Sequence, residues 1–328
     1  MRAAPPQLKP RPPLRTSKLR RACSAECLKR VNQITGKPEQ VALVECDIRD
    51  KAQIAAVFAT RTFDGVIHFA GYKAVGESKA KPMIYYTNNL KGSINLFEVM
   101  AEAGCKSLVF SSSCTVYGSS SSPLQEDSAT GVGITNAYAR TKFQIEEVLK
   151  DLQQADPQWK VCILRYFNPV GAHPSGLIGE DPRGIPNCLM PYVLQVLVGR
   201  LEKLTVYGSD YETRDGTPIR DYIHVVDVAA GHLDALAWMA KQAGGLLDTF
   251  NFGTGNGVTV FELVHAMERA SGQKVPLFVG ARRPGDLKES YCMPDKAARV
   301  LGWKAKLSLD DMCAHAWKWQ SANPNGFA

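Results

Sequence analysis

Four short apolar runs alternate with helical stretches in the first half of the chain. The apolar runs cover residues 41–45, 65–70, 107–111 and 161–167. Because they are continuous rather than alternating, they are typical of strands buried on both faces of a parallel sheet. Helical stretches lie between them near residues 52–60, 83–104 and 136–155. Strands alternating with helices predict βαβ units, and therefore an α/β fold with a doubly wound parallel sheet.

The pattern changes after about residue 176. Loops rich in Gly, Pro and Asp separate helical stretches near residues 187–200, 226–242, 259–271 and 308–320. We therefore expect a second, smaller lobe of mixed α/β structure. The predicted organisation has three parts, with some interleaving between the last two: residues 1–22, 23–176 and 177–328.

Charge is concentrated at the N-terminal end. The 328 residues carry a net charge of +7, but residues 1–22 hold seven basic groups, five prolines and no acid. The remainder has 39 − 7 = 32 basic and 32 acidic residues. We expect the tail to be disordered, and a targeting peptide and a faulty gene start both stay open as explanations. A neutral body without a basic patch interleaved with aromatics predicts no nucleic-acid binding.

Cysteine usage and hydropathy exclude several other classes. Nine cysteines are scattered without a C-x-x-C pair, so we expect reduced thiols, a cytoplasmic location and no metal site. No run of 18 apolar residues occurs, so we expect no membrane-spanning helix.

The strongest candidate chemistry is a tyrosine and a lysine one helical turn apart. Tyr138 and Lys142 fall at the start of the helical stretch near residue 136. At this spacing they share a face, and an ammonium beside a phenol lowers the phenol's pKa towards the working range of a general base. A chance pair on a solvated helix is the alternative. Ser113 follows the third predicted strand, where parallel sheets bind ligands.

Other predicted strand ends carry groups suited to ligands. Gly71 and Lys73 follow the second strand, and Tyr166 ends the fourth. Arg220 and the pair Arg282–Arg283 suit phosphate oxygens, although surface charge is the simpler reading of each. The run at 253–257 is not G-x-G-x-x-G, and we interpret it as a turn before a helix.

Together these segments resemble the UDP-glucose 4-epimerases, a family of extended short-chain dehydrogenase/reductases with a Rossmann-type sheet. The resemblance covers residues 24–328 and includes "VIHFAGYKAVGESKAKP", "FSSSCTVYG", "LRYFNPVGAHPSG", "IGEDPRGIPN", "RDYIHVVD" and "RRPGDL". It implies that Tyr138 takes the proton from the sugar 4-hydroxyl, Lys142 lowers its pKa and holds the cofactor ribose, and Ser113 bonds the 4-oxygen. The C4 hydride would pass to bound NAD and return to the other face of a 4-keto sugar.

The resemblance also implies binding residues. Those matching NAD-contacting positions are Asp47, Phe69, Ala70, Gly71, Lys73, Asn88 and Tyr166. Those matching positions that hold the UDP part are Asn168, Arg220, Tyr222, Arg283 and Asp286. Residues 23–176 would then be the dinucleotide-binding domain and residues 177–328 the UDP-sugar lobe, and the family suggests a homodimer.

Two departures qualify what the resemblance implies, and one absence agrees with it. The family's opening strand and glycine-rich turn are not seen, so the sheet would be truncated and we expect this chain to bind NAD weakly or not at all. Cys188 replaces a uridine-side amide. The carboxylate pair of related dehydratases is absent near Thr115, which speaks against loss of water.

Two alternatives remain at this stage. Ser290 lies near the position that limits the sugar pocket in the family, so a UDP-N-acetylhexosamine or a UDP-pentose could be the substrate. A truncated homologue without catalytic activity is the other reading, although Ser113, Tyr138 and Lys142 are all present.

Overall fold

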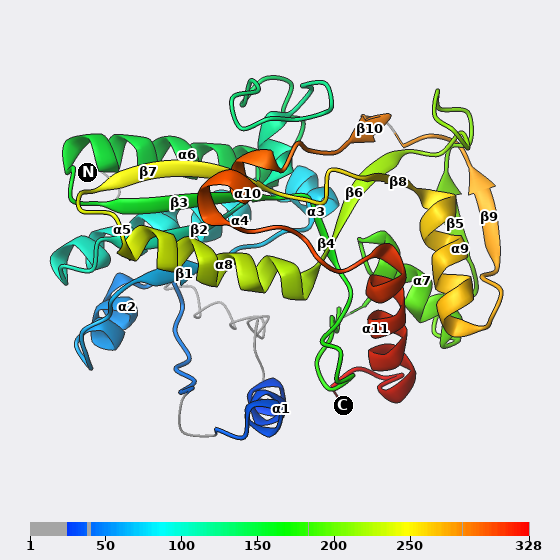
Figure 1. Ribbon diagram of the computed structural model, residues 1–328, viewed down its shortest axis with the longest axis horizontal. Helices are drawn as coiled ribbons and strands as arrows, with labels where there is room; N and C mark the ends of the chain where they lie inside the picture. The colour runs from blue at the N-terminus through cyan, green and yellow to red at the C-terminus, as the bar shows by residue number, and fades with distance from the viewer. Residues whose placement is uncertain (1–24, 38–40, 183, 284, 328) are drawn as a thin grey trace, which may run out of the picture.

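The computed structural model describes residues 25–37, 41–182, 184–283 and 285–327. Its centre is a four-stranded parallel sheet in the order β1-β2-β3-β7 (Figure 1). The strands are β1 (Val66–His68), β2 (Ser107–Ser113), β3 (Lys160–Tyr166) and β7 (Leu246–Phe252). Three of the four predicted strands are therefore confirmed, and β7 was not predicted.

The prediction of a strand at residues 41–45 is wrong. Residues 41–47 have no regular secondary structure, and Val44 is 59% exposed. Within the described part of the chain, β1 is the last strand on this side of the sheet, and residues 41–45 do not pair with it. An apolar run forms a strand only where a neighbour accepts its hydrogen bonds.

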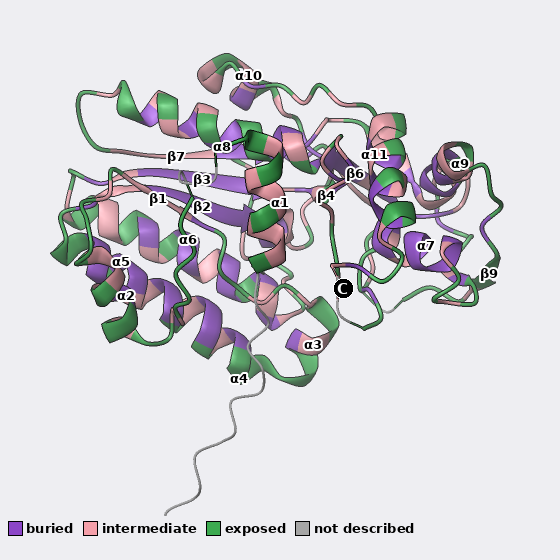
Figure 2. Ribbon diagram, turned by 90° about the horizontal axis from the view of Figure 1, so that it is seen from below, coloured by how far each residue is buried: buried purple, intermediate pink, exposed green. Residues whose placement is uncertain are grey.

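Helices cover both faces of the parallel sheet (Figure 2). On one face lie α2 (Lys51–Phe58), α5 (Gly92–Glu102) and α6 (Ala137–Ala155), and on the other lie α8 (Val225–Ala240) and α10 (Asp295–Leu301). Each face has its own apolar core. Phe110 and Leu149 belong to the first, and Leu164 and Trp303 to the second. The predicted doubly wound α/β architecture is confirmed.

The predicted helix at 83–104 is divided into shorter segments. The short helices α3 (Val75–Ala80) and α4 (Pro82–Tyr85) lead into a π-helical turn at Tyr86–Lys91, and α5 follows. Such turns often occur at functional sites. Here the turn carries Asn88 and Asn89, which are both buried beside the exit of β1.

The second lobe packs around its own core. A small sheet has the order β10-β6-β4, formed by β10 (Glu289–Ser290), β6 (Ile219–His224) and β4 (Asn168–Val170), and β8 (Gly257–Thr259) pairs with β6. Strands β5 (Leu204–Tyr207) and β9 (Leu277–Gly280) form a second ladder. Around these lie α7 (Leu189–Leu197), α9 (Val260–Ser271) and α11 (Leu309–Ala322). A lobe of mixed structure is therefore present.

The two lobes interleave along the chain. β7, α8 and α10 fall after residue 176 but pack on or within the parallel sheet. Conversely, α1 (Ala25–Thr35) contacts the second lobe, because the Arg30 guanidinium donates to the Leu177 carbonyl at 3.1 Å and lies over the Trp319 ring. The boundary near residue 176 stays a prediction, and the tail at 1–22 lies outside the described residues.

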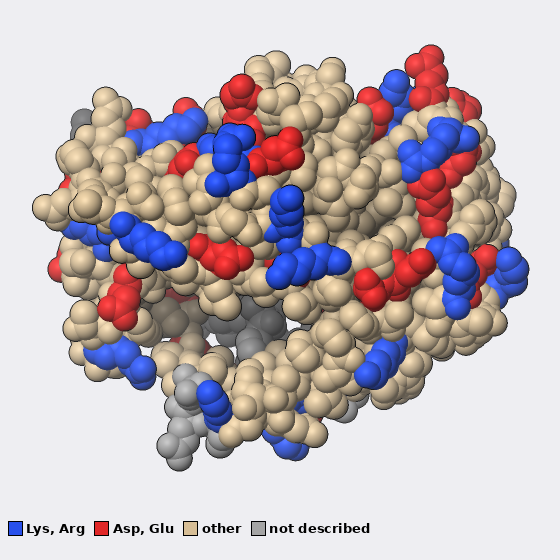
Figure 3. Space-filling model, in the orientation of Figure 1, with Lys and Arg blue, Asp and Glu red and all other residues tan. Residues whose placement is uncertain are grey.

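The described residues also show the state of the cysteines, the polarity of the helices and the distribution of surface charge. Across the described ranges, every helix is too short or too polar to cross a bilayer. The residues placed in the structure form no group of His, Cys, Asp and Glu able to hold a metal ion. The described cysteines that are free thiols include Cys46, Cys105, Cys114, Cys162, Cys188, Cys292 and Cys313. On the face seen in Figure 3, basic and acidic side chains are interspersed.

Candidate active site

The carboxyl ends of β2 and β3 bring the predicted catalytic groups to one rim of the sheet. Ser113 and Tyr166 are direct partners in the ladder between these strands. Ser113 is the last residue of β2, and the 3₁₀ turn Cys114–Tyr117 begins immediately after it. The Thr115 hydroxyl donates to Ser113 Oγ at 3.0 Å, which fixes the serine side chain at the rim.

Tyr138 lies at this rim because α6 begins beside it. Asn136 caps the helix by accepting a hydrogen bond from the Ala139 amide at 2.9 Å. Burial raises the pKa of Tyr138, while the Ser113 hydroxyl and the Lys73 ammonium act to lower it. The structure therefore brings Ser113 and Tyr138 together, with the phenol protonated at neutral pH.

Lys142 is close by but points elsewhere. Its ammonium donates to the Ser111 carbonyl and lies 4.8 Å from the centre of the Phe110 ring. Burial lowers the pKa of Lys142 to about 8. The prediction that Lys142 lowers the pKa of Tyr138 stays a prediction. The two residues share a helix face, the lysine side chain turns beneath the rim, and Lys73 is an ammonium that acts to lower the pKa of the phenol.

The loop after β1 carries most of the predicted cofactor contacts. Phe69, Ala70 and Gly71 are exposed at the rim. The Asn89 side chain accepts from the Tyr72 amide at 2.8 Å and donates to the Thr141 hydroxyl at 3.2 Å. It thereby ties this loop to α6.

Asn88 lies behind the same loop, where its side-chain amide donates to Asn89 Oδ1 at 3.1 Å. Sequence reasoning singled out Asn88 and missed Asn89. The pair of consecutive amides in an apolar stretch was the available signal.

Lys73 extends from the first lobe towards the second. Its ammonium lies 3.2 Å from a Glu180 carboxylate oxygen. Desolvation lowers the pKa of Lys73, but Glu180, Cys188 and Tyr138 together outweigh this effect, so that the net shift of the pKa is upward. The Cys188 thiol is close enough to act electrostatically on both Lys73 and Tyr138. The exposed thiol that replaces the expected amide therefore lies near both Lys73 and Tyr138.

Tyr166 forms the side of the rim nearest α8. Its hydroxyl is hydrogen-bonded to the His232 ring, and the Phe69 ring centre lies 4.8 Å from that of His232. Burial raises the pKa of Tyr166, so the phenol stays protonated. The Tyr166 hydroxyl is engaged by the protein itself.

Asp47 lies apart from the rim residues. It precedes α2 and forms an ion pair with Arg49, with 2.5 Å between Asp47 Oδ2 and Arg49 Nη2. The hydrogen bond from Arg49 lowers the pKa of Asp47, so it is ionised. Its predicted contact with NAD stays a prediction.

The predicted UDP residues gather on β6 and the loop before β10. Asn168 and Tyr222 are partners in the ladder between β4 and β6, and Arg220 is the partner of Ser290 in β10. The Arg220 guanidinium forms an ion pair with Asp286. Burial raises the pKa of Tyr222, which therefore offers a neutral hydroxyl.

Two neighbouring arginines of this region have different surroundings. Arg282 pairs with Asp210 at 2.7 Å, whereas the Arg283 guanidinium lies 3.9 Å from the centre of the Tyr207 ring. A cation over an aromatic ring is attracted to the ring, so this contact restricts the position of the Arg283 guanidinium. Such a fork suits phosphate oxygens.

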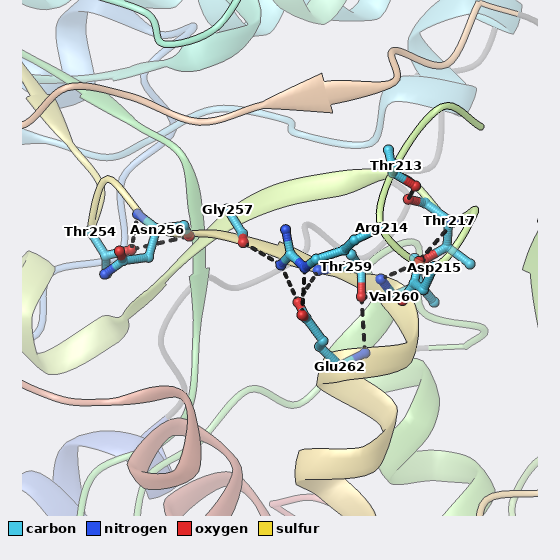
Figure 4. Close-up of polar contacts among 10 residues, drawn as sticks. All are labelled: Thr213, Arg214, Asp215, Thr217, Thr254, Asn256, Gly257, Thr259, Val260 and Glu262. Atoms are coloured by element: carbon cyan, nitrogen blue, oxygen red, sulfur yellow. Dashed lines mark hydrogen bonds and ion pairs between the residues drawn. The ribbon is translucent and has the colours of Figure 1, made fainter.

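The loop before β6 is attached to the start of α9. Arg214 Nε donates to Glu262 Oε1 at 2.6 Å, and Arg214 Nη2 donates to the Gly257 carbonyl at 2.7 Å (Figure 4). Thr259 and Glu262 also form the capping box of α9. These bonds fix β8 and, through it, Arg220 on β6.

The glycine-rich run at 253–257 is a turn, as predicted. The amides of Thr254 and Gly255 donate to the Asp221 carboxylate at 2.8 and 3.0 Å. Asp221 is fully buried on β6. Because a carboxylate of the protein already accepts from these two amides, they are not free to bind a phosphate.

Cys114 lies between the candidate catalytic residues and the residues predicted to bind UDP. Its thiol interacts with the hydroxyls of Ser290 and Ser113, and Arg220 lies within electrostatic reach of it. A continuous series of neighbouring residues thus runs from Tyr138 through Cys114 to Arg220.

The residues of the rim fit the nicotinamide end of NAD. Ser113 and Tyr138 offer hydroxyl groups, Lys142 lies directly beneath them, and Gly71 leaves the loop without a side chain. Hydroxyl and ammonium donors suit the hydroxyls of a ribose and a sugar. For the pyrophosphate, the described residues provide no glycine-rich turn leading from the rim beside β1 into a helix.

Comparisons with known proteins agree with this geometry. Residues 12–253 match the NAD dependent epimerase/dehydratase family. The chain is 53% identical over 305 residues to UDP-glucose 4-epimerase of Bacillus subtilis, covering 93% of this chain and 88% of that protein. It is 54% identical to the enzyme of the same name from Bos taurus, with 92% and 86% covered.

A solved structure extends the agreement to three dimensions. The crystal structure of UDP-glucose 4-epimerase from Bifidobacterium longum in complex with NAD+ and UDP superimposes with a TM-score of 0.87 at 49% identity, covering 92% of this chain and 89% of that one. The chain therefore belongs to the NAD dependent epimerase/dehydratase family and, within it, to the UDP-glucose 4-epimerases.

Proposed function

We propose that this protein interconverts UDP-glucose and UDP-galactose by epimerisation at C4, with NAD as cofactor. The observation that carries the proposal is the convergence of Ser113 and Tyr138 at the end of β2, beside strand β6 with Arg220. The rim supplies groups that move a proton, and β6 supplies groups that hold a nucleotide diphosphate. A role in galactose metabolism, a homodimer and a cytoplasmic location form part of the same proposal.

The proposed chemistry assigns one proton to Tyr138. In the first half of a turnover the phenolate oxygen takes the proton of the sugar 4-hydroxyl, and in the second half the phenol returns it to the 4-oxygen. Ser113 Oγ holds the sugar 4-oxygen by a hydrogen bond as its charge changes. When bound, NAD would accept the C4 hydride and return it to the opposite face of the 4-keto sugar, and its positively charged oxidised ring would favour the phenolate.

Lys142 and Lys73 have different roles in this proposal. Lys73 lies on the open side of Tyr138 and lowers the pKa of the phenol. Lys142 lies beneath the rim, where it holds the end of β2 through the Ser111 carbonyl. We propose that Lys142 also donates to the nicotinamide ribose, as in the family.

The UDP end of the substrate is assigned to the second lobe. We propose that Arg220 and Arg283 bind the diphosphate and that Asn168, Tyr222 and Asp286 hold the remaining polar groups. Arg220 is already oriented by Asp286, and Arg283 by the Tyr207 ring. Preorganised guanidinium groups bind phosphate oxygens strongly because each bond involves opposite charges.

A second substrate class is favoured by one observation. The small Ser290 meets Cys114 where the two halves adjoin, so the pocket wall carries no large side chain at that position. We propose UDP-N-acetylglucosamine as the alternative substrate. Assaying UDP-N-acetylglucosamine and UDP-galactose side by side tests this, since turnover of UDP-galactose alone would reject the alternative.

A further inference from the structure

A buried carboxylate that the proposed mechanism does not use lies one helical turn beyond Lys142. Glu146 is 0% exposed on α6. Tyr138, Lys142 and Glu146 are spaced four residues apart, so they form a stripe along the face of α6 that packs on the sheet. The site tyrosine, the lysine and this carboxylate therefore share one rigid element.

The partners of Glu146 come from the two strands whose ends form the site. Arg165 Nη2 donates to Glu146 Oε2 at 2.7 Å, and Arg165 Nε donates to Oε1 at 3.1 Å. The Ser112 hydroxyl also donates to Oε1. Ser112 and Arg165 are ladder partners, and each immediately precedes a rim residue, Ser113 or Tyr166. The carboxylate thus joins α6 to both strands directly below the rim.

Arg165 is itself held in place. Its Nη1 donates to the Glu126 carbonyl at 3.0 Å, and its guanidinium lies 4.7 Å from the centre of the Tyr117 ring. With a side chain only 4% exposed, it has no alternative partner in water. The geometry of the pair is therefore fixed, and so is the turn of α6 that carries it.

The Glu146 carboxylate also interacts electrostatically with the Lys142 ammonium. Burial lowers the pKa of Lys142 to about 8, and the Glu146 carboxylate acts in the opposite direction. The other groups around the ammonium are the Ser111 carbonyl, the Phe110 ring and His68 on β1. Burial, assisted by Lys142, lowers the pKa of His68 to about 3, so His68 is neutral. Glu146 is the group here that carries the opposite charge.

We propose that Glu146 is a positioning residue: it fixes the Lys142-bearing turn of α6 against the ends of β2 and β3 and keeps the lysine charged. This inference rests on the proposed function of the site, which gives Lys142 its task. Its test does not, because the protonation of Lys142 can be followed without turnover.

The experiment follows Lys142 by NMR in the chain labelled with ¹³C,¹⁵N-lysine, without added cofactor or substrate. Comparison with Lys142→Met assigns the signal. In Glu146→Gln we expect the acid dissociation constant of Lys142 to rise at least tenfold. Glu147→Gln is the matched control, since the neighbouring Glu147 is exposed and pairs with Lys150 at 2.6 Å. We expect no change in that variant.

A second variant covers the case in which an unpaired Arg165 prevents folding. Glu146→Gln combined with Arg165→Met removes both charges of the pair, so Arg165 is not left as an unpaired buried ion. We expect this variant to fold and still to show the rise in the acid dissociation constant. An unchanged Lys142 titration in either folded variant, or an equal change in Glu147→Gln, would overturn the proposal. A shifted titration in a chain that never turns over UDP-galactose would instead contradict the proposed function alone.

Discussion

The Lys142 ammonium donates to the carbonyl of Ser111, two residues before the serine that faces Tyr138. The lysine therefore supports the rim from below. The protonation of Lys142 is consequently linked to the folding of the chain around β2. The pH dependence of the protein's stability measures this linkage.

We predict that Lys142→Met changes the pH dependence of stability. The folded chain holds the pKa of Lys142 at about 8, below its value of 10.5 in an unfolded chain. Between these pH values the unfolded state binds more protons, so wild-type stability rises with pH. The free energy of unfolding of Lys142→Met, relative to wild type, should fall by up to roughly 3 kcal/mol from pH 7.5 to pH 10.5.

Urea unfolding at both pH values measures this difference. Lys150→Met, on the exposed side of the same helix, controls for general alkaline effects. A relative stability of Lys142→Met that is the same at both pH values would contradict the buried position of the ammonium.

We predict that Arg283→Gln weakens UDP binding at least tenfold, because it removes charge-assisted hydrogen bonds to phosphate oxygens. Isothermal titration calorimetry with UDP measures the effect. Arg282→Gln is a closely matched control, since the adjacent guanidinium is already engaged by Asp210. Equal weakening by the two substitutions would show that Arg283 acts only through the net charge of the loop.

We predict that the chain as purified carries far less than one NAD. Among the described residues, the rim beside β1 offers no glycine-rich turn whose amides could bind the pyrophosphate. Release of bound nucleotide by acid and enzymatic assay of NAD per chain measures the occupancy. A value near one would show that the residues described here, or others of the chain, complete the site.

The parts of the fold that the sequence could reveal are those with uniform burial. β2 and β3 are covered on both faces, so their apolar runs are continuous. β7 escaped prediction because Asp248 and Asn251 interrupt its apolar residues. Asp248 pairs with Lys296, and the Asn251 side-chain amide donates to the Leu124 carbonyl at 3.0 Å. These polar residues serve long-range contacts that a local pattern does not contain.

The sequence predicts that Tyr138 and Lys142 lie on one face of a helix, but it does not predict the direction of the lysine side chain. The spacing of Tyr138 and Lys142 fixes a shared helix face, but it leaves the direction of a four-carbon side chain open. The supporting pair of Glu146 and Arg165 was missed, since nothing in the local sequence relates a helix carboxylate to an arginine on a later strand. Residues 41–45 show the opposite error, in which an apolar run has no neighbouring strand.

The most direct test is the turnover of UDP-galactose to UDP-glucose by wild type and Tyr138→Phe, with NAD supplied in saturating excess. Loss of general acid–base catalysis typically costs about 10²- to 10⁴-fold in rate. We predict turnover in wild type, a reduction of that order in Tyr138→Phe with an unchanged melting temperature, and near-normal turnover in the control Tyr192→Phe on α7. Absence of turnover in wild type under these conditions, or equal rates in wild type and Tyr138→Phe, would contradict the account.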